Sequence, residues 1–125
     1  MNKTIVDSEI KSAYEAIKEC KISEDGKSVE KTFRGQISSF GAAVTMGSLT
    51  SAIAFFADNG GASVERSKLL DAIVYVLKDA RNKKLENAKE LFDYANTNKR
   101  EAKEEILNAA LAIKLALNLY TLEKK

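Results

Sequence analysis

Apolar residues recur three and four positions apart along most of this 125-residue chain, which is the spacing of one face of an α-helix. The first such stripe covers residues 6–20, and the turn-forming run at 23–26 is expected to end its helix. Thr4 or Asp7 is expected to cap its start. No segment alternates apolar and polar residues over a convincing length, so the pattern predicts an all-α protein.

A second helix, the longest of the chain, is expected over residues 28–57 with Ser28 as its N-cap. Its large apolar residues lie on one face as far as Val44 and on nearly the opposite side beyond Gly47. Either the helix bends near Gly47, or its second half is covered from more than one direction. We favour the second interpretation, with a possible bend. The run Asp-Asn-Gly-Gly at 58–61 closes the helix, because glycine suits the left-handed conformation at a helix end.

The pattern predicts three further helices. The first is expected to begin at Ser63, and the last begins with a capping box formed by Asn98 and Glu101. The last helix carries two apolar stripes, so it should be buried on two sides, in the core or against another subunit. Residues 1–125 are therefore expected to form a compact single-domain bundle of about five to six helices with a long central helix. The approximate ranges of the three further helices are 63–77, 85–95 and 99–122.

The stretch 35–57 contains 23 residues without a formal charge, in a chain of which 30% is charged. Its length would suffice for a membrane span, but its seven polar residues and the lack of tryptophan argue against one. Small residues recur at every fourth position and form a ridge, which predicts that another backbone packs closely against it. The ridge consists of Gly35, Ser39, Ala43, Gly47 and Ser51.

Proline, tryptophan and histidine are absent from the chain. Without proline, long helices are favoured. Without histidine, the usual general base and the commonest metal ligand are missing, and no phosphate-binding loop or Cys/His cluster is present instead. The sequence therefore indicates no catalytic residue, no metal site and no cofactor. The single cysteine, Cys20, cannot form an intramolecular disulfide, which fits a reducing cytoplasm and a role as a small apolar side chain.

The net charge of +2 is too small to indicate nucleic-acid binding by itself, but charge can be concentrated locally. On the helix expected over 28–57, two cations are followed by three hydroxyls roughly in line. Such a face suits a phosphate backbone, because cations attract phosphate and hydroxyls position it. Composition alone favours the alternative of a solvated helix face. The five residues are Lys31, Arg34, Ser38, Thr45 and Ser48.

Three stretches carry a family resemblance: FRGQISSFGAAVTMGSLTSAIAFFADNGG, LLDAIVYVL and EILNAALAIKLALNLY. Across roughly residues 28–122 the chain resembles the small subunit of the type III-B, Cmr-type CRISPR RNA-guided effector complex. That family has a glycine-leucine turn of helix that leads to an alanine-phenylalanine pair. Its counterpart here is Gly47-Ser48-Leu49 followed by Ala54-Phe55, with a serine between glycine and leucine. The internal lysine of the last helix, Lys114, is also similar.

The resemblance implies a non-catalytic subunit with an all-helical fold that acts in cytoplasmic antiviral defence. Such subunits stack in tandem along the inner face of the complex, beside the backbone subunits that hold the guide RNA. They help to hold the target RNA paired with the guide, and cleavage belongs to the backbone subunits. The implied partners are the other subunits, including the backbone subunit and copies of itself, and the guide and target RNA. No membrane and no small-molecule substrate is implied.

Charge clustering, and not matched family ligands, suggests which residues contact RNA. The expected contacts are the cations Lys27, Lys31 and Arg34, the hydroxyls Ser38 and Ser39, and a second patch of Arg81, Lys83 and Lys84. Each cation could instead be a solubilising surface charge. Two other functions stay open: a helical protein–protein interaction or homo-oligomeric scaffold module without a nucleic-acid role, and a small helical enzyme or membrane-associated protein. A continuous basic strip would support the RNA hypothesis over an evenly mixed surface.

Overall fold

The computed structural model describes residues 2–62 and 64–123, and within these residues it contains six helices and one two-stranded sheet. The predicted all-α bundle is confirmed, and the two short strands are an addition that the sequence pattern did not predict. In chain order the elements are α1 (Lys3–Glu19), β1 (Ser28–Glu30), α2 (Thr32–Met46), α3 (Leu49–Ala57), α4 (Ser67–Arg81), α5 (Ala88–Thr97), α6 (Lys99–Leu117) and β2 (Thr121–Glu123).

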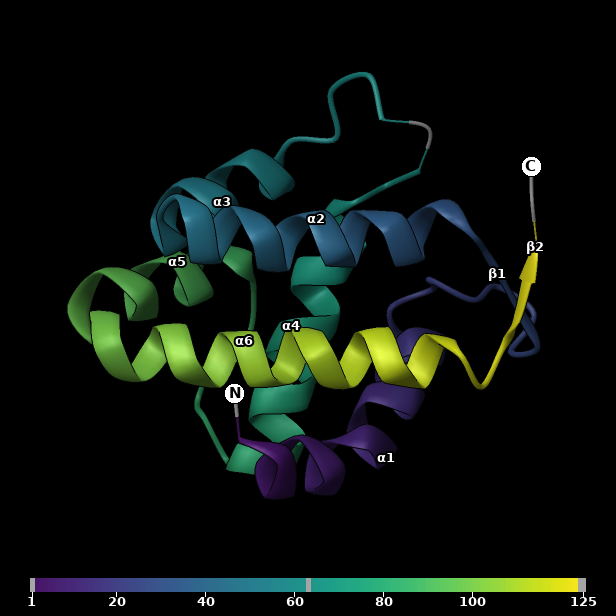
Figure 1. The fold of residues 1–125 in the computed structure, drawn as a ribbon, viewed down its shortest axis with the longest axis horizontal. Coiled ribbons are helices and arrows are strands. Elements are labelled where there is room, and N and C mark those ends of the chain that lie inside the picture. The colour runs from purple at the N-terminus through teal and green to yellow at the C-terminus, as the bar shows by residue number, and fades with distance from the viewer. Residues whose placement is uncertain (1, 63, 124–125) are drawn as a thin grey trace.

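Helix α6 lies at the centre of the bundle and contacts α1, α2, α4 and α5. Figure 1 shows α6 running antiparallel to α2, with α4 crossing behind it. The predicted burial of α6 on two sides is confirmed. Much of the buried surface, however, comes from alanines and not from the leucines of the second apolar stripe. Ala102, Ala112 and Ala116 are fully buried, whereas Leu115 is 39% exposed. Small side chains on α6 thus let its neighbours pack closely.

The single helix expected over 28–57 is wrong, because the structure divides it at Gly47 and Ser48 into α2 and α3. Ser48 has an extended backbone, and its side-chain oxygen accepts a hydrogen bond from the Ser51 amide at 3.1 Å. This bond caps the first turn of α3 and stabilises a new helix start at that point. The bend suspected near Gly47 is therefore a complete break.

The break lets the apolar faces of α2 and α3 meet. Phe40 of α2 and Phe56 of α3 pack edge to face, with ring centroids 5.2 Å apart. This folding back explains why the apolar stripe changes sides along the sequence. Among the helices that the structure describes, none is both long enough and apolar enough to cross a membrane.

The ridge of small residues does not pack against another part of the described chain. All five of its residues are exposed. A Cβ added at Gly35 would meet no described atom within 4 Å outside its own helix backbone. At Gly47, in contrast, an added Cβ would lie 2.9 Å from the carbonyl oxygen of Ala43. The close packing predicted for this ridge is therefore wrong within the chain, and the one tight contact comes from the helix break.

The segment around Ser28 is a strand and not the start of a helix. β1 pairs in parallel with β2, with Val29 opposite Leu122. Before the strand, Asp25 accepts hydrogen bonds from the amides of Ser28 and Lys27, both at 2.8 Å. These bonds lower the pKa of Asp25 well below its usual range. The turn predicted at 23–26 is thus present, but it leads into β1, and α2 begins four residues later than expected.

Two helix ends near the surface test the capping predictions. Asn2 caps α1, because its Oδ1 accepts a hydrogen bond from the Ile5 amide at 3.2 Å. The caps expected at Thr4 and Asp7 are wrong, since both residues lie inside α1. At the end of α3, Gly60 adopts a left-handed φ of +49°, which confirms the glycine-dependent turn expected there.

The remaining boundaries differ in detail. Ser63, the expected cap of the third predicted helix, lies outside the described residues, and α4 begins at Ser67. Asn98 makes no side-chain capping bond to α6, so the capping box is wrong. Its Oδ1 accepts instead from the hydroxyl of Thr97. The last helix ends at Leu117, earlier than expected, because the chain turns there into β2.

Candidate nucleic-acid interface

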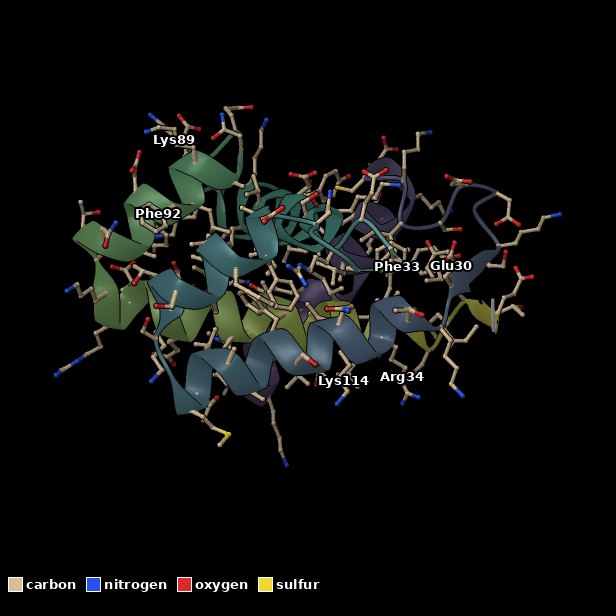
Figure 2. All side chains as sticks on the ribbon, turned by 90° about the horizontal axis from the view of Figure 1, so that it is seen from above. Glu30, Phe33, Arg34, Lys89, Phe92 and Lys114 are labelled. Carbon is tan, nitrogen blue, oxygen red and sulfur yellow. The ribbon has the colours of Figure 1, made fainter. Side chains whose placement is uncertain are left out.

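A basic groove of about 330 Å³ lies between the N-terminal half of α2 and the C-terminal half of α6. It is lined by Lys31, Arg34, Gly35 and Ser38 from the start of α2 and by Lys114 from α6. The spacing of three and four residues places the α2 residues on one face. The antiparallel packing of the two helices brings Lys114 to the same place (Figures 1 and 2).

The three cations of this basic groove are not neutralised by acidic side chains. Lys31, Arg34 and Lys114 form no ion pair with any residue in 2–62 or 64–123. Nε of Arg34 is buried and has no hydrogen-bond partner within the described part of the chain. Three positive charges therefore converge at one end of the bundle, with at least one hydrogen-bond donor unused.

The hydroxyl of Ser38 lines the groove but is already engaged, because it donates to the carbonyl oxygen of Arg34 at 3.1 Å. Ser39 is exposed on α2 and does not line the groove. Lys27 is exposed in the turn before β1, and its carbonyl oxygen accepts from the Thr121 amide. Of the five residues predicted for the first patch, the structure brings Lys31, Arg34 and Ser38 together.

The second predicted patch consists mostly of paired charges. Arg81 Nε lies 3.2 Å from Oε2 of Glu9, and a terminal guanidinium nitrogen donates to the hydroxyl of Ser8 at 3.0 Å. Lys84 is exposed and forms no ion pair among the described residues. The side chain of Arg81 is thus held by residues of α1, whereas the charge of Lys84 stays available to a ligand.

Lys83 is the most strongly paired cation of that patch. Its Nζ lies 3.1 Å from Glu101 and 3.2 Å from Glu105, both on α6, and 5.2 Å from the ring centroid of Tyr94. The hydrogen bond to Glu101, followed by the one to Glu105, raises the pKa of Lys83. The Tyr94 hydroxyl in turn donates to Glu105. Lys83 thus joins α5 to α6 and is a poor candidate for binding phosphate.

Glu9, the ion-pair partner of Arg81, is a buried carboxylate. It is fully buried on α1, and neither carboxylate oxygen has a hydrogen-bond partner among the described residues, although Arg81 is close enough for an ion pair. Burial raises the pKa of Glu9 to about 7, with Arg81 acting in the opposite direction and Glu105 in the same one. Burial likewise raises the pKa of Cys20 to about 11, so its thiol stays protonated at neutral pH.

The opposite side of the α2 N-terminus carries an acidic cleft of about 480 Å³. Figure 2 shows Glu30 and Phe33 on that side, while Arg34 and Lys114 lie on the side of the basic groove. Neither this cleft nor any other part of residues 2–62 and 64–123 has three or more Cys, Asp or Glu side chains grouped so that they could hold a metal ion. The carboxylates of the cleft repel a phosphate backbone. They are Glu24, Asp25, Glu30, Glu65 and Glu123.

Residues 7–116, which span α1 to nearly the end of α6, match the family described as CRISPR-associated protein (Cas_Cmr5). The chain belongs to the Cmr5 family. It is a small subunit of the type III-B, Cmr-type CRISPR complex, and the family resemblance found in the sequence is confirmed. No curated protein and no solved structure gives a significant match.

The family match covers all five residues that line the basic groove of this Cmr5-family subunit. Two charged residues that the structure places at or near the predicted patches, Lys114 and Glu9, are not among the contacts predicted from the sequence. Lys114 had one signal, since it is the only charge between Ile106 and Leu122. Glu9 had a weaker one, since it precedes Ile10 on α1 and borders the predicted stripe.

Proposed function

We propose that this Cmr5-family subunit is non-catalytic and helps to hold target RNA paired with guide RNA through contacts to the nucleic-acid backbone. In this proposal it stacks with copies of itself beside the backbone subunits, along the inner face of a cytoplasmic complex that acts in antiviral defence. The observation that supports it is the basic groove, where Lys31, Arg34 and Lys114 converge without acidic partners among the described residues.

Contacts of this kind do not depend on base sequence. The groove offers cations to phosphate and no aromatic side chain to a base. Sequence is read by pairing between guide and target, so a protein that touches only the backbone is sufficient for the role. A single groove makes few contacts, and its affinity for RNA is expected to be low until several stacked copies act together.

A scaffold function without RNA is the second candidate. It is favoured by large apolar side chains that are exposed in the described chain, at Met46, Phe55 and Leu119. Phe55 is partly shielded, since the Arg66 guanidinium stacks 4.1 Å from its ring centroid. Exposed apolar residues are common on soluble proteins, and Met46 lies on α2, Phe55 on α3 and Leu119 in the turn after α6. The cations of the groove would then have no role in target binding.

The test is charge reversal in the assembled complex. The double variant Lys31→Glu/Arg34→Glu is expected to weaken target-RNA binding, and to reduce the dependence of log affinity on log salt by about 0.7 for each lost phosphate contact. The matched control is Arg100→Glu/Lys103→Glu, which makes the same charge change at exposed positions of α6 without a described ion pair. Unchanged binding by the first variant across a salt titration would refute the proposal and favour the scaffold.

A further inference from the structure

We infer that the basic groove is a phosphodiester-binding site in which Lys114 is the third cation, so that the RNA strand crosses from α2 to α6 instead of following α2. The inference rests on the proposed function, because it takes RNA as the source of the phosphate. It adds a phosphate-binding role for Lys114, which the structure places beside Lys31 and Arg34, and the direction of the strand.

Lys114 stands in surroundings that do not otherwise favour a charge. It lies between the buried residues Ile113 and Ala116 and next to the half-exposed Leu115, and it is the only charge from Ile106 to Leu117 of α6. Its side chain is half-buried, which fits a lysine whose methylene groups lie along apolar surface while the ammonium reaches water or a ligand. The ammonium reaches the groove, and no described carboxylate pairs with it.

Arg34 supplies the second argument. An N–H that is buried without a partner costs free energy, and Nε of Arg34 is such a group within the described chain. No ion pair with a described residue holds its side chain in place, so the guanidinium can turn into the groove and donate to an anion there. Arginine binds phosphate with two parallel hydrogen bonds, which would use the unsatisfied donor.

The space for the anion is provided by Gly35. Its missing side chain leaves open space in the groove, because even a Cβ there would meet no described atom within 4 Å. A volume of about 330 Å³ is at the lower end of the range for small-ligand sites, about 300–1,000 Å³, and exceeds what a phosphate group alone requires. A phosphodiester with part of its sugar is the corresponding unit of RNA.

A path of the RNA strand along α2 is disfavoured, because the hydroxyls there already form hydrogen bonds within the protein. Ser38 donates to the Arg34 carbonyl, Thr45 donates to the Gly41 carbonyl at 2.9 Å, and the Ser48 oxygen caps α3. No cation follows Arg34 on α2. The remaining cation that lines the groove is Lys114 of α6, so a strand that keeps contact with these cations crosses from α2 to α6.

Two variants that each lower the charge by one separate the paths in the assembled complex. Lys114→Gln is expected to weaken target-RNA binding about tenfold, the effect of losing one charged hydrogen bond, and to reduce the salt dependence by about one contact. Thr45→Glu is expected to have little effect, because it lies about 16 Å along the α2 axis from Arg34, twice the screening length of about 8 Å at physiological salt. Lys114→Arg keeps the charge and is expected to preserve binding.

Thermal unfolding of each subunit and assembly of the complex without target RNA are measured in parallel. Loss of assembly in Lys114→Gln would show that Lys114 contacts a protein, and the inference would be wrong. Full binding by Lys114→Gln together with loss in Thr45→Glu would place the strand along α2. In either case, weakened RNA binding by Lys31→Glu/Arg34→Glu in assembled complexes would still support the proposed function. If that double variant and Lys114→Gln both bind normally, the function and the inference both fail.

Discussion

The buried carboxylate of Glu9 should make the stability of this protein depend on pH in an unusual direction. The perturbation is Glu9→Gln, which keeps the shape of the side chain and removes its titration. In the folded protein the pKa of Glu9 is about 7, above its ordinary value of 4.5, because burial disfavours the charged form more than the nearby Arg81 favours it.

The sign of the effect follows from proton binding. Between about pH 4.5 and pH 7 the folded state holds more protons at Glu9 than the unfolded state, so the free energy of unfolding falls as the pH rises. Each unit corresponds to about 1.4 kcal/mol, so the interval removes about 3 kcal/mol, and the loss is complete above the folded pKa. Glu9→Gln should lack this slope. Near pH 8 Glu9→Gln should be more stable than the wild type. The loss of the ion pair with Arg81 makes this gain smaller than about 3 kcal/mol.

The assay is urea denaturation of the isolated subunit at half-unit steps from pH 5 to pH 8, for the wild type and Glu9→Gln. The difference between the two proteins isolates Glu9, because any other group that titrates in this range contributes to both. Glu104→Gln serves as the control, since Glu104 is exposed on α6 and forms no described ion pair. Equal slopes for the wild type and Glu9→Gln, or a Glu9→Gln protein that is the less stable one at pH 8, would show that the Arg81 ion pair outweighs burial.

Two further predictions concern the helix break and are measured by thermal unfolding. Gly47→Ala should lose about 1–3 kcal/mol of stability, because its Cβ would stand 2.9 Å from the Ala43 carbonyl oxygen, whereas Gly35→Ala should gain up to about 1 kcal/mol, because α2 is open there. Equal effects of the two substitutions would contradict the contact at Gly47. Ser48→Ala should cost about 1 kcal/mol by removing the cap of α3, and a melting temperature equal to that of the wild type would show that this cap contributes nothing.

The helical pattern was readable in the sequence wherever one face is apolar and the other polar. α1 and α4 are such helices, and their buried residues include Val6, Ile17, Leu69 and Leu77 of the predicted stripes. The division of α2 from α3 had a signal too, because the apolar stripe changes sides at Gly47 and Ser48 is a suitable cap. The pattern alone does not distinguish such a break from one helix that is buried from several directions, which is the interpretation favoured from the sequence.

The strands and the buried ion pair could not be read in the same way. β1 and β2 have three residues each, and their pairing joins Ser28 to Thr121 across most of the chain. The pairing of Glu9 with Arg81 and the approach of Lys114 to Arg34 likewise depend on how α1, α4 and α6 pack. Periodicity reports only which face of an element is buried, so contacts between distant elements stay invisible until the fold is known.

The stretch without charge, residues 35–57, is partly exposed to solvent. Its small side chains are open on α2, so the absence of charge from Gly35 to Ala57 does not come from burial alone. No lysine or arginine follows Arg34 on α2, and the acidic cleft lies on the other side of its N-terminus, so the positive charge of α2 is concentrated at the groove. In the proposed function each copy would offer RNA one short contact, so holding a long duplex of guide and target would require many copies in line.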